Sequence, residues 1–112
     1  MAGSVPEVSV AELQRLLAGE NPPRLIDVRE PDEWELCRIP GAELIPLSQW
    51  PQLALEKLPE KDAPLLLQCH HGGRSARATA WLLGQGFTNV HNIAGGIDAW
   101  SVEIDPSVPR YE

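Results

Sequence analysis

The chain of 112 residues has no long apolar run, few cationic residues and only two cysteines, and each shortage excludes a class of protein. A membrane span needs about 20 consecutive apolar residues, whereas the longest near-continuous apolar stretch runs only from Pro64 to Cys69. Nine Lys and Arg residues against 16 Asp and Glu residues give a net charge of −7, so phosphate backbones would repel the chain and we expect no nucleic-acid partner. The first residues lack the basic and apolar segments of a secretory signal, so we predict a cytoplasmic protein, away from membranes, with reduced thiols.

The length and composition predict one domain over residues 1–112. Hydrophobic residues make up 43% of the chain and charged residues 22%, which are ordinary proportions for a globular protein with one core. Neither a repeat nor a linker divides the sequence. Because Pro106 and Pro109 are incompatible with a helix interior, we predict that residues 101–112 form an extended strap across the domain.

Short apolar segments alternate along the chain with segments of helical periodicity. The expected strands cover residues 24–28, 43–45, 65–69 and 89–93. The expected helices are one capped by Ser9, one capped by Ser48 and running through Leu58, and three over residues 32–36, 75–83 and 97–100. This alternation predicts an α/β fold in which helices cover both faces of a parallel sheet.

The segment Cys69-His-His-Gly-Gly-Arg-Ser75 stands between an expected buried strand and an expected helix. In parallel sheets, sites form at the carboxyl ends of strands. Two glycines allow a tight loop with inward-pointing N–H groups, and the helix that follows adds free N–H donors and its dipole. We therefore predict that Cys69 is a thiolate nucleophile. The predicted anion-binding groups are mainly the backbone amides of His70, His71, Gly72, Gly73, Arg74 and Ser75.

Some side chains of this segment have a second interpretation. The Arg74 guanidinium could contact a substrate anion or pair with a local carboxylate. The His70 and His71 imidazoles could join a zinc site with Cys37, Cys69 and His91. Adjacent histidines do not match the usual ligand spacings, so we predict neither a metal nor a dissociable cofactor. One imidazole is expected to shape access to the site.

The spacing of the segment limits what it can hold. Four residues separate Cys69 from Arg74, one fewer than in the Cys-x5-Arg loop of protein tyrosine phosphatases. A shorter loop gives a narrower site, which suits one additional sulfur atom better than a phosphoryl group. A phosphatase or an arsenate reductase is therefore the less favoured enzyme class.

Several segments resemble the single-domain rhodaneses. Besides the Cys69 loop, they are Arg24-Leu-Ile-Asp-Val-Arg29, Glu33-Trp34, Ile39-Pro-Gly-Ala42 and Ile93-Ala-Gly-Gly-Ile-Asp-Ala-Trp100. The resemblance runs from about Val8 to Trp100. It implies a rhodanese-like, five-stranded, mostly parallel sheet with helices on both faces. It also implies that Cys69 forms a persulfide, cradled by the amides of the loop.

The resemblance further implies a ping-pong sulfur transfer through Cys69. Thiosulfate or a persulfide would donate the sulfane sulfur, and cyanide or a thiol such as thioredoxin or glutathione would accept it. The alternative is a non-catalytic rhodanese-like module for binding or sulfur sensing, because a fold alone does not guarantee activity.

The remaining notable residues are expected to be structural. Where many rhodaneses have Gly-His, this chain has Cys37 and Arg38, and we interpret Cys37 as core packing or as a resolving thiol. Asp27 and Arg29 are expected to tie a strand end to neighbouring loops. The four tryptophans are expected to pack in the core or at its rim, not to form a binding stripe.

Overall fold

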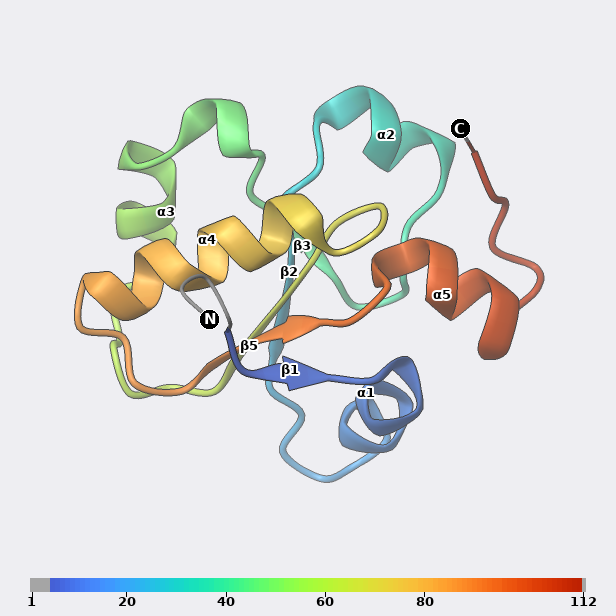
Figure 1. Ribbon diagram of the computed structural model, residues 1–112, viewed down its shortest axis with the longest axis horizontal. Coiled ribbons are helices and arrows are strands. Elements are labelled where there is room, and N and C mark those ends of the chain that lie inside the picture. Colours follow the sequence, from blue (N-terminus) through green and yellow to red (C-terminus); the bar gives the residue numbers. More distant parts are fainter. Residues whose placement is uncertain (1–4, 112) are drawn as a thin grey trace.

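Five strands form the central sheet of the computed structural model, which describes residues 5–111, in the order β1-β5-β4-β2-β3 (Figure 1). They are β1 (Glu7–Val8), β2 (Arg24–Asp27), β3 (Glu43–Leu44), β4 (Leu65–Gln68) and β5 (Val90–Ile93). All four pairs of neighbouring strands are parallel, so the predicted α/β class is confirmed. The strand β1 lies outside the predicted segments because two residues carry no periodic pattern, and only its pairing with β5 defines it.

Within residues 5–111, helices cover both faces of the sheet, as predicted. They are α1 (Val10–Leu17), α2 (Pro31–Leu36), the 3-10 helix η1 (Leu47–Gln49), α3 (Gln52–Lys57), α4 (Gly73–Gly84) and α5 (Gly96–Glu103). Successive strand residues point to opposite faces: Leu25 and Leu66 belong to the core cluster with α1 and α5, whereas Ile26 and Leu67 belong to the cluster with α3 and α4. None of the described helices is long and apolar enough to cross a membrane.

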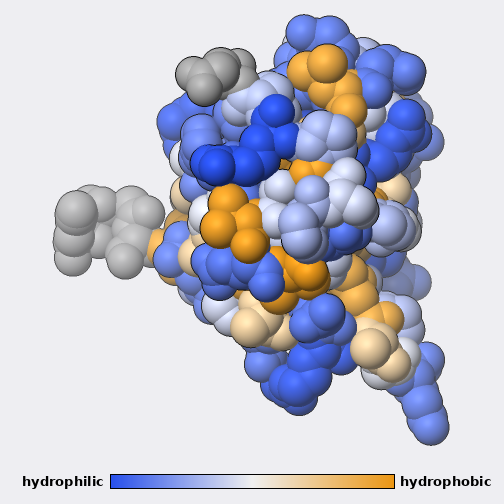
Figure 2. Space-filling model, turned by 90° about the vertical axis from the view of Figure 1, so that its right-hand side faces the viewer, coloured by the Kyte–Doolittle hydropathy of each residue, from blue (hydrophilic) through white to orange (hydrophobic). Residues whose placement is uncertain are grey.

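The side of the molecule that carries α5 and the C-terminal segment is mostly hydrophilic (Figure 2). Apolar residues appear there in patches between polar ones. The large apolar side chains are instead concentrated in the two core clusters on either face of the sheet.

The prediction of a helix that begins at Ser48 is wrong. Ser48 lies in η1, and α3 begins four residues later, at Gln52. The reason is Pro51, which disfavours helical backbone in the residue before it; Trp50 is extended, with ψ 154°. The Ser48 hydroxyl donates a hydrogen bond to Glu30 Oε1 at 2.5 Å instead of capping a helix.

The C-terminal segment leaves the helix later than expected. We predicted an extended strap from residue 101, but α5 continues through Glu103. The Ser101 hydroxyl donates to the Val108 carbonyl at 2.5 Å, and the buried Val108 side chain joins the cluster around α1 and α5. From Asp105 to Tyr111 the chain is non-helical and held against the domain, and residue 112 lies outside the described residues.

Candidate active site

Cys69 directly follows β4 at the carboxyl edge of the sheet. The neighbouring strands β2 and β5 end at the same edge, because they run parallel to β4. The helix α4 begins at Gly73, two residues earlier than expected, so its first turn closes the loop around Cys69. The sequence-predicted position at the mouth of the sheet is therefore where the structure places this thiol.

Three hydrogen-bond donors surround the Cys69 sulfur. The Gly72 amide donates to Sγ at 3.1 Å, the Ser75 amide donates at 3.4 Å, and the Ser75 hydroxyl lies 3.4 Å away. Burial raises the pKa of Cys69, but hydrogen bonds from the Ser75 hydroxyl and from the amides of Ser75, Gly72 and Arg74 outweigh it. The net pKa therefore lies below the ordinary value for a thiol. Cys69 therefore ionises more readily than a free thiol.

Three of the other predicted amides do not bond the Cys69 sulfur. No hydrogen bond in the described part of the chain joins Sγ to the amides of His70, His71 or Gly73. His71 and Gly73 are exposed on the outside of the loop, whereas Cys69 is only 1% exposed. The Cys69 side chain is therefore almost completely shielded from solvent.

The start of α5 holds the backbone of the loop by hydrogen bonds to two of its carbonyls. The Ile97 amide donates to the Cys69 carbonyl at 2.8 Å, and the Asp98 amide donates to the His70 carbonyl at 3.0 Å. These bonds hold both carbonyls toward α5 and away from the sulfur. Gly96 permits the contact, because a Cβ there would lie 2.2 Å from the Cys69 oxygen. From the sequence, Gly95-Gly96 with Trp100 is interpreted as a turn and anchor close to the mouth of the site, and the paired glycines are the signal for it.

Ser75 is fixed by a buried polar chain. Its hydroxyl has one proton, and the acceptors within reach include Asn92 Oδ1 at 2.5 Å and Cys69 Sγ at 3.4 Å. The Asn92 amide group donates in turn to the Gly72 carbonyl at 3.2 Å and to Glu7 Oε2 at 3.0 Å, so its orientation is determined by its partners. Asn92 thus connects β5 to both residues that bond the Cys69 sulfur. The sequence interpretation missed it.

Arg74 pairs with a carboxylate, the second of its two predicted roles. Its guanidinium donates to both oxygens of Glu33 at 2.7 and 2.8 Å. This interaction with Arg74 is the largest cause that lowers the pKa of Glu33, to about 2. Because Glu33 occupies both arms of the guanidinium, the expected direct contact between this side chain and a substrate anion is not favoured by the geometry. The Arg74 amide still contributes to the lowered pKa of Cys69.

The C-terminal segment reaches the site through Tyr111. Its ring stacks on that of His70, with centroids 3.9 Å apart and an interplanar angle of 9°. The His70 ring also contacts that of His71 at 3.9 Å. The Tyr111 hydroxyl donates to Glu33 Oε2 at 2.7 Å. One aromatic side chain therefore fixes the outer wall of the loop and the partner of Arg74, a role that nothing in the local sequence indicated.

Asp27 and Arg29 form the predicted structural tie. Both side chains are fully buried, and the Arg29 Nη2 donates to Asp27 Oδ2 at 2.6 Å. Other guanidinium hydrogens reach the carbonyls of Glu33 and Cys37 and the Tyr111 hydroxyl. Arg29 thus connects β2 with α2 and the C-terminal segment.

The described residues bring together one group that could hold a metal ion, namely His70, His71 and Asp98, whose ligand atoms lie within 4.8 Å of one another. Both Asp98 oxygens accept hydrogen bonds from Arg110, at 2.9 and 3.1 Å, so this carboxylate already has a cationic partner. The zinc set considered from the sequence differs: Cys37 packs in the cluster around α1 and α5, and Cys69 in the cluster on the opposite face of the sheet.

Comparisons with known proteins agree with this geometry. The family model of the rhodanese-like domain matches residues 9–103. The chain is 47% identical over 92 residues to the chloroplastic rhodanese-like/PpiC domain-containing protein 12 of Arabidopsis thaliana, covering 79% of this chain but only 30% of that protein. It is 32% identical over 103 residues to the thiosulfate sulfurtransferase GlpE of Pseudoalteromonas translucida, covering 92% of this chain and 95% of that one. The crystal structure of a rhodanese-like domain protein from Staphylococcus aureus has a TM-score of 0.80 at 28% identity, covering 96% and 99% of the two chains.

Proposed function

The chain belongs to the rhodanese-like domain family, and we propose that it transfers a sulfane sulfur from thiosulfate, or from a persulfide, to a thiol. Cys69 is the proposed nucleophile. The observation that carries the proposal is the set of donors around its sulfur, from Gly72 and Ser75. The similarity to a thiosulfate sulfurtransferase along nearly the whole chain supports the same class of reaction.

In the first half-reaction, the Cys69 thiolate attacks the outer sulfur of thiosulfate. A new S–S bond forms to Cys69, the S–S bond of thiosulfate breaks, and its electron pair leaves with sulfite. The negative charge moves to the terminal sulfur of the Cys69 persulfide. Backbone N–H groups that already point into the loop stabilise this charge without reorganising. Because the attacking and leaving groups are both stable anions, no general base is needed.

In the second half-reaction, the thiolate of the acceptor attacks the terminal persulfide sulfur. The bond between that sulfur and Cys69 breaks, its electrons return to the Cys69 thiolate, and the acceptor leaves as a persulfide. The burial of Cys69, which is 1% exposed, favours compact donors. We also propose a cytoplasmic setting, where reduced thiols are available as acceptors.

Intact-mass spectrometry tests the proposal directly. Wild-type protein incubated with thiosulfate should gain about 32 Da, the mass of one sulfur atom, and lose it when cyanide or a thiol is added. Cys69→Ser should gain no mass. Cys37→Ser, the matched control for the second thiol, should gain one sulfur atom like the wild type. Wild-type protein that gains no sulfur from thiosulfate or from a persulfide donor would instead favour a binding module.

A further inference from the structure

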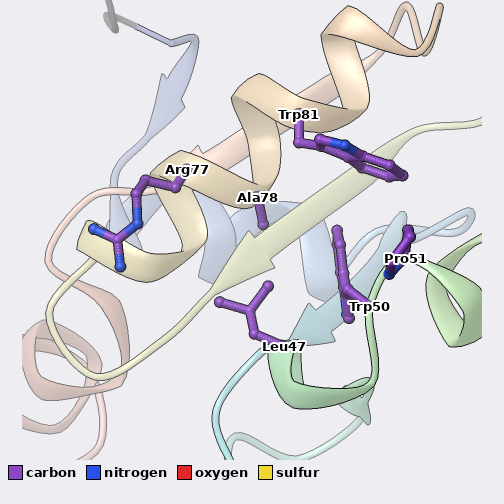
Figure 3. A pocket seen from close by; sticks show the side chains of 6 residues that line it. All are labelled: Leu47, Trp50, Pro51, Arg77, Ala78 and Trp81. Atoms are coloured by element: carbon purple, nitrogen blue, oxygen red, sulfur yellow. The ribbon is translucent and has the colours of Figure 1, made fainter.

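A pocket of about 280 Å³ lies between α4 and the segment that follows β3. Figure 3 shows that α4 supplies one wall and the segment around η1 the other. The lining residues are Leu47, Trp50, Pro51, Arg77, Ala78 and Trp81. The mechanism described above uses none of these six residues.

The walls formed by the two tryptophans are apolar, and contacts within the protein hold them in place without a ligand. The rings of Trp50 and Trp81 meet edge to face, with centroids 5.9 Å apart and an interplanar angle of 63°. The Trp50 indole N–H donates to the Ile45 carbonyl at 2.9 Å, which fixes that ring. Both tryptophans pack at the rim of the core, as expected from the sequence, but they also present a surface to the pocket. A cavity of about 150 Å³ can hold benzene, so this pocket has room for one aromatic ring with a short substituent.

One end of the pocket lies near the sulfur loop along α4. Arg77, Ala78 and Trp81 follow Arg74 at the three-, four- and seven-residue spacings that place side chains on one face of a helix. This stripe starts beside the loop and runs away from it along α4 (Figure 3). Cys69 belongs to the same core cluster as Ala78 and as the two tryptophans packed against it. Ala78 follows Ser75 on α4 by three residues, and the Ser75 amide donates to Cys69 Sγ. The end of the pocket at Arg77 and Ala78 is therefore about one helical turn from the residues that bond the sulfur.

Arg77 gives the pocket a charge preference. Five other arginines each pair with a carboxylate: Arg15, Arg24, Arg29, Arg74 and Arg110. Among residues 5–111, no ion pair or hydrogen bond involves the Arg77 side chain, although the chain carries a net charge of −7. An exposed cation at the end of the pocket nearer the loop is complementary to an anionic group placed there.

We propose that this pocket binds the sulfur acceptor, and that the acceptor is a small thiol with an anionic group near its sulfur and an apolar body of about one ring. The carboxylate would meet Arg77, the ring would lie against Trp50 and Trp81, and the thiolate would face the Cys69 persulfide. The transfer step is the second half-reaction written above, so the inference rests on the proposed function and specifies its acceptor.

Binding is measured first, in the absence of sulfur chemistry. Hydrocinnamate, which has the ring and the carboxylate but no thiol, should change tryptophan fluorescence saturably, because Trp50 and Trp81 line the pocket. Hydrocinnamyl alcohol and propionate, which each lack one of the two groups, should bind at least about fivefold more weakly. Equal responses to all three compounds would overturn the proposal. Because this measurement does not involve Cys69, it remains informative if the protein forms no persulfide.

Acceptor kinetics then test the position of the pocket. Protein charged with thiosulfate is mixed with α-mercapto-β-phenylpropionate, with thiolactate, which lacks the ring, or with phenylethanethiol, which lacks the carboxylate. The first acceptor should have the highest kcat/KM. Arg77→Gln should lower its kcat/KM about five- to tenfold relative to phenylethanethiol, and Arg77→Glu should lower it further. Arg15→Gln makes the same charge change on α1 and should leave the ratio unaltered.

Two results would overturn the inference. One is a ratio of acceptor rates that Arg77→Glu does not change. The other is a preference for a protein acceptor: if thioredoxin discharges the persulfide faster than every small thiol and its rate falls in Arg77→Gln, the pocket serves a protein surface and not a small molecule.

Discussion

Replacing Gly96 by alanine should deform the sulfur loop from behind. The added Cβ would lie 2.2 Å from the Cys69 carbonyl oxygen and 2.7 Å from that of His70, whereas contacts under 3.0 Å essentially never occur. Both obstacles are backbone atoms, so they cannot rotate away. The loop and the start of α5 must separate by roughly 1 Å, the difference between these distances and ordinary contact.

The expected loss of stability follows from what that separation breaks. The hydrogen bonds from Ile97 to Cys69 and from Asp98 to His70 contribute about 1 kcal/mol each. Alanine at the φ of +59° that Gly96 adopts costs about 1 kcal/mol more. The total of about 3 kcal/mol corresponds to a fall in Tm of roughly 10 to 20 °C for a chain of this size. A shift of about 1 Å at the reacting sulfur would also slow persulfide formation about 100-fold.

Thermal unfolding and the rate of mass gain with thiosulfate measure the two effects separately. Gly84→Ala is the matched control, because a Cβ there meets nothing within 4 Å and its backbone is helical. It should keep both the Tm and the rate. Should Gly96→Ala unfold within about 2 °C of the wild type and charge within about twofold of its rate, the contact with α5 would not shape the loop.

Three further substitutions test the site. Ser75→Ala removes the hydroxyl 3.4 Å from Cys69 Sγ, so the pH midpoint of thiolate ultraviolet absorbance should rise; an unchanged midpoint would assign the lowered pKa to the amides alone. In Glu33→Gln, the pH dependence of stability should weaken. The pKa of this carboxyl falls from 4.5 to about 2 on folding, so its contribution to stability is full above about pH 4.5 and is lost as the pH drops toward 2. The urea midpoints of the wild type and the variant should therefore converge as the pH falls across that range. Midpoints that stay equally far apart would contradict this. Tyr111→Phe keeps the ring on His70 but loses the hydroxyl contacts with Glu33 and Arg29, so the urea midpoint should fall by the equivalent of about 1 to 2 kcal/mol while the charging rate stays within about threefold.

Much of the fold could be predicted from local patterns. Ser9 caps α1 by accepting a hydrogen bond from the Glu12 amide at 3.1 Å, as its position in the sequence indicated. The apolar run before Cys69 forms β4, with all four residues buried. These features depend on residues close together in the chain, so periodicity and capping chemistry identify them. The same reasoning failed at Ser48, where the restriction from Pro51 outweighed a suitable capping side chain.

The sequence by itself determined the reactive group and its setting: a cysteine at the end of a buried strand, followed by glycines and a helix. Only the tertiary structure decided what surrounds that group. Arg74 could meet an anion or a carboxylate until folding brought Glu33, 41 residues away, against it. Tyr111 bonds Glu33 across 78 residues, and Asn92 holds Ser75 across 17. The chemistry of a side chain follows from its residue type alone. Its partner depends on which distant segments the packed sheet brings to the same edge.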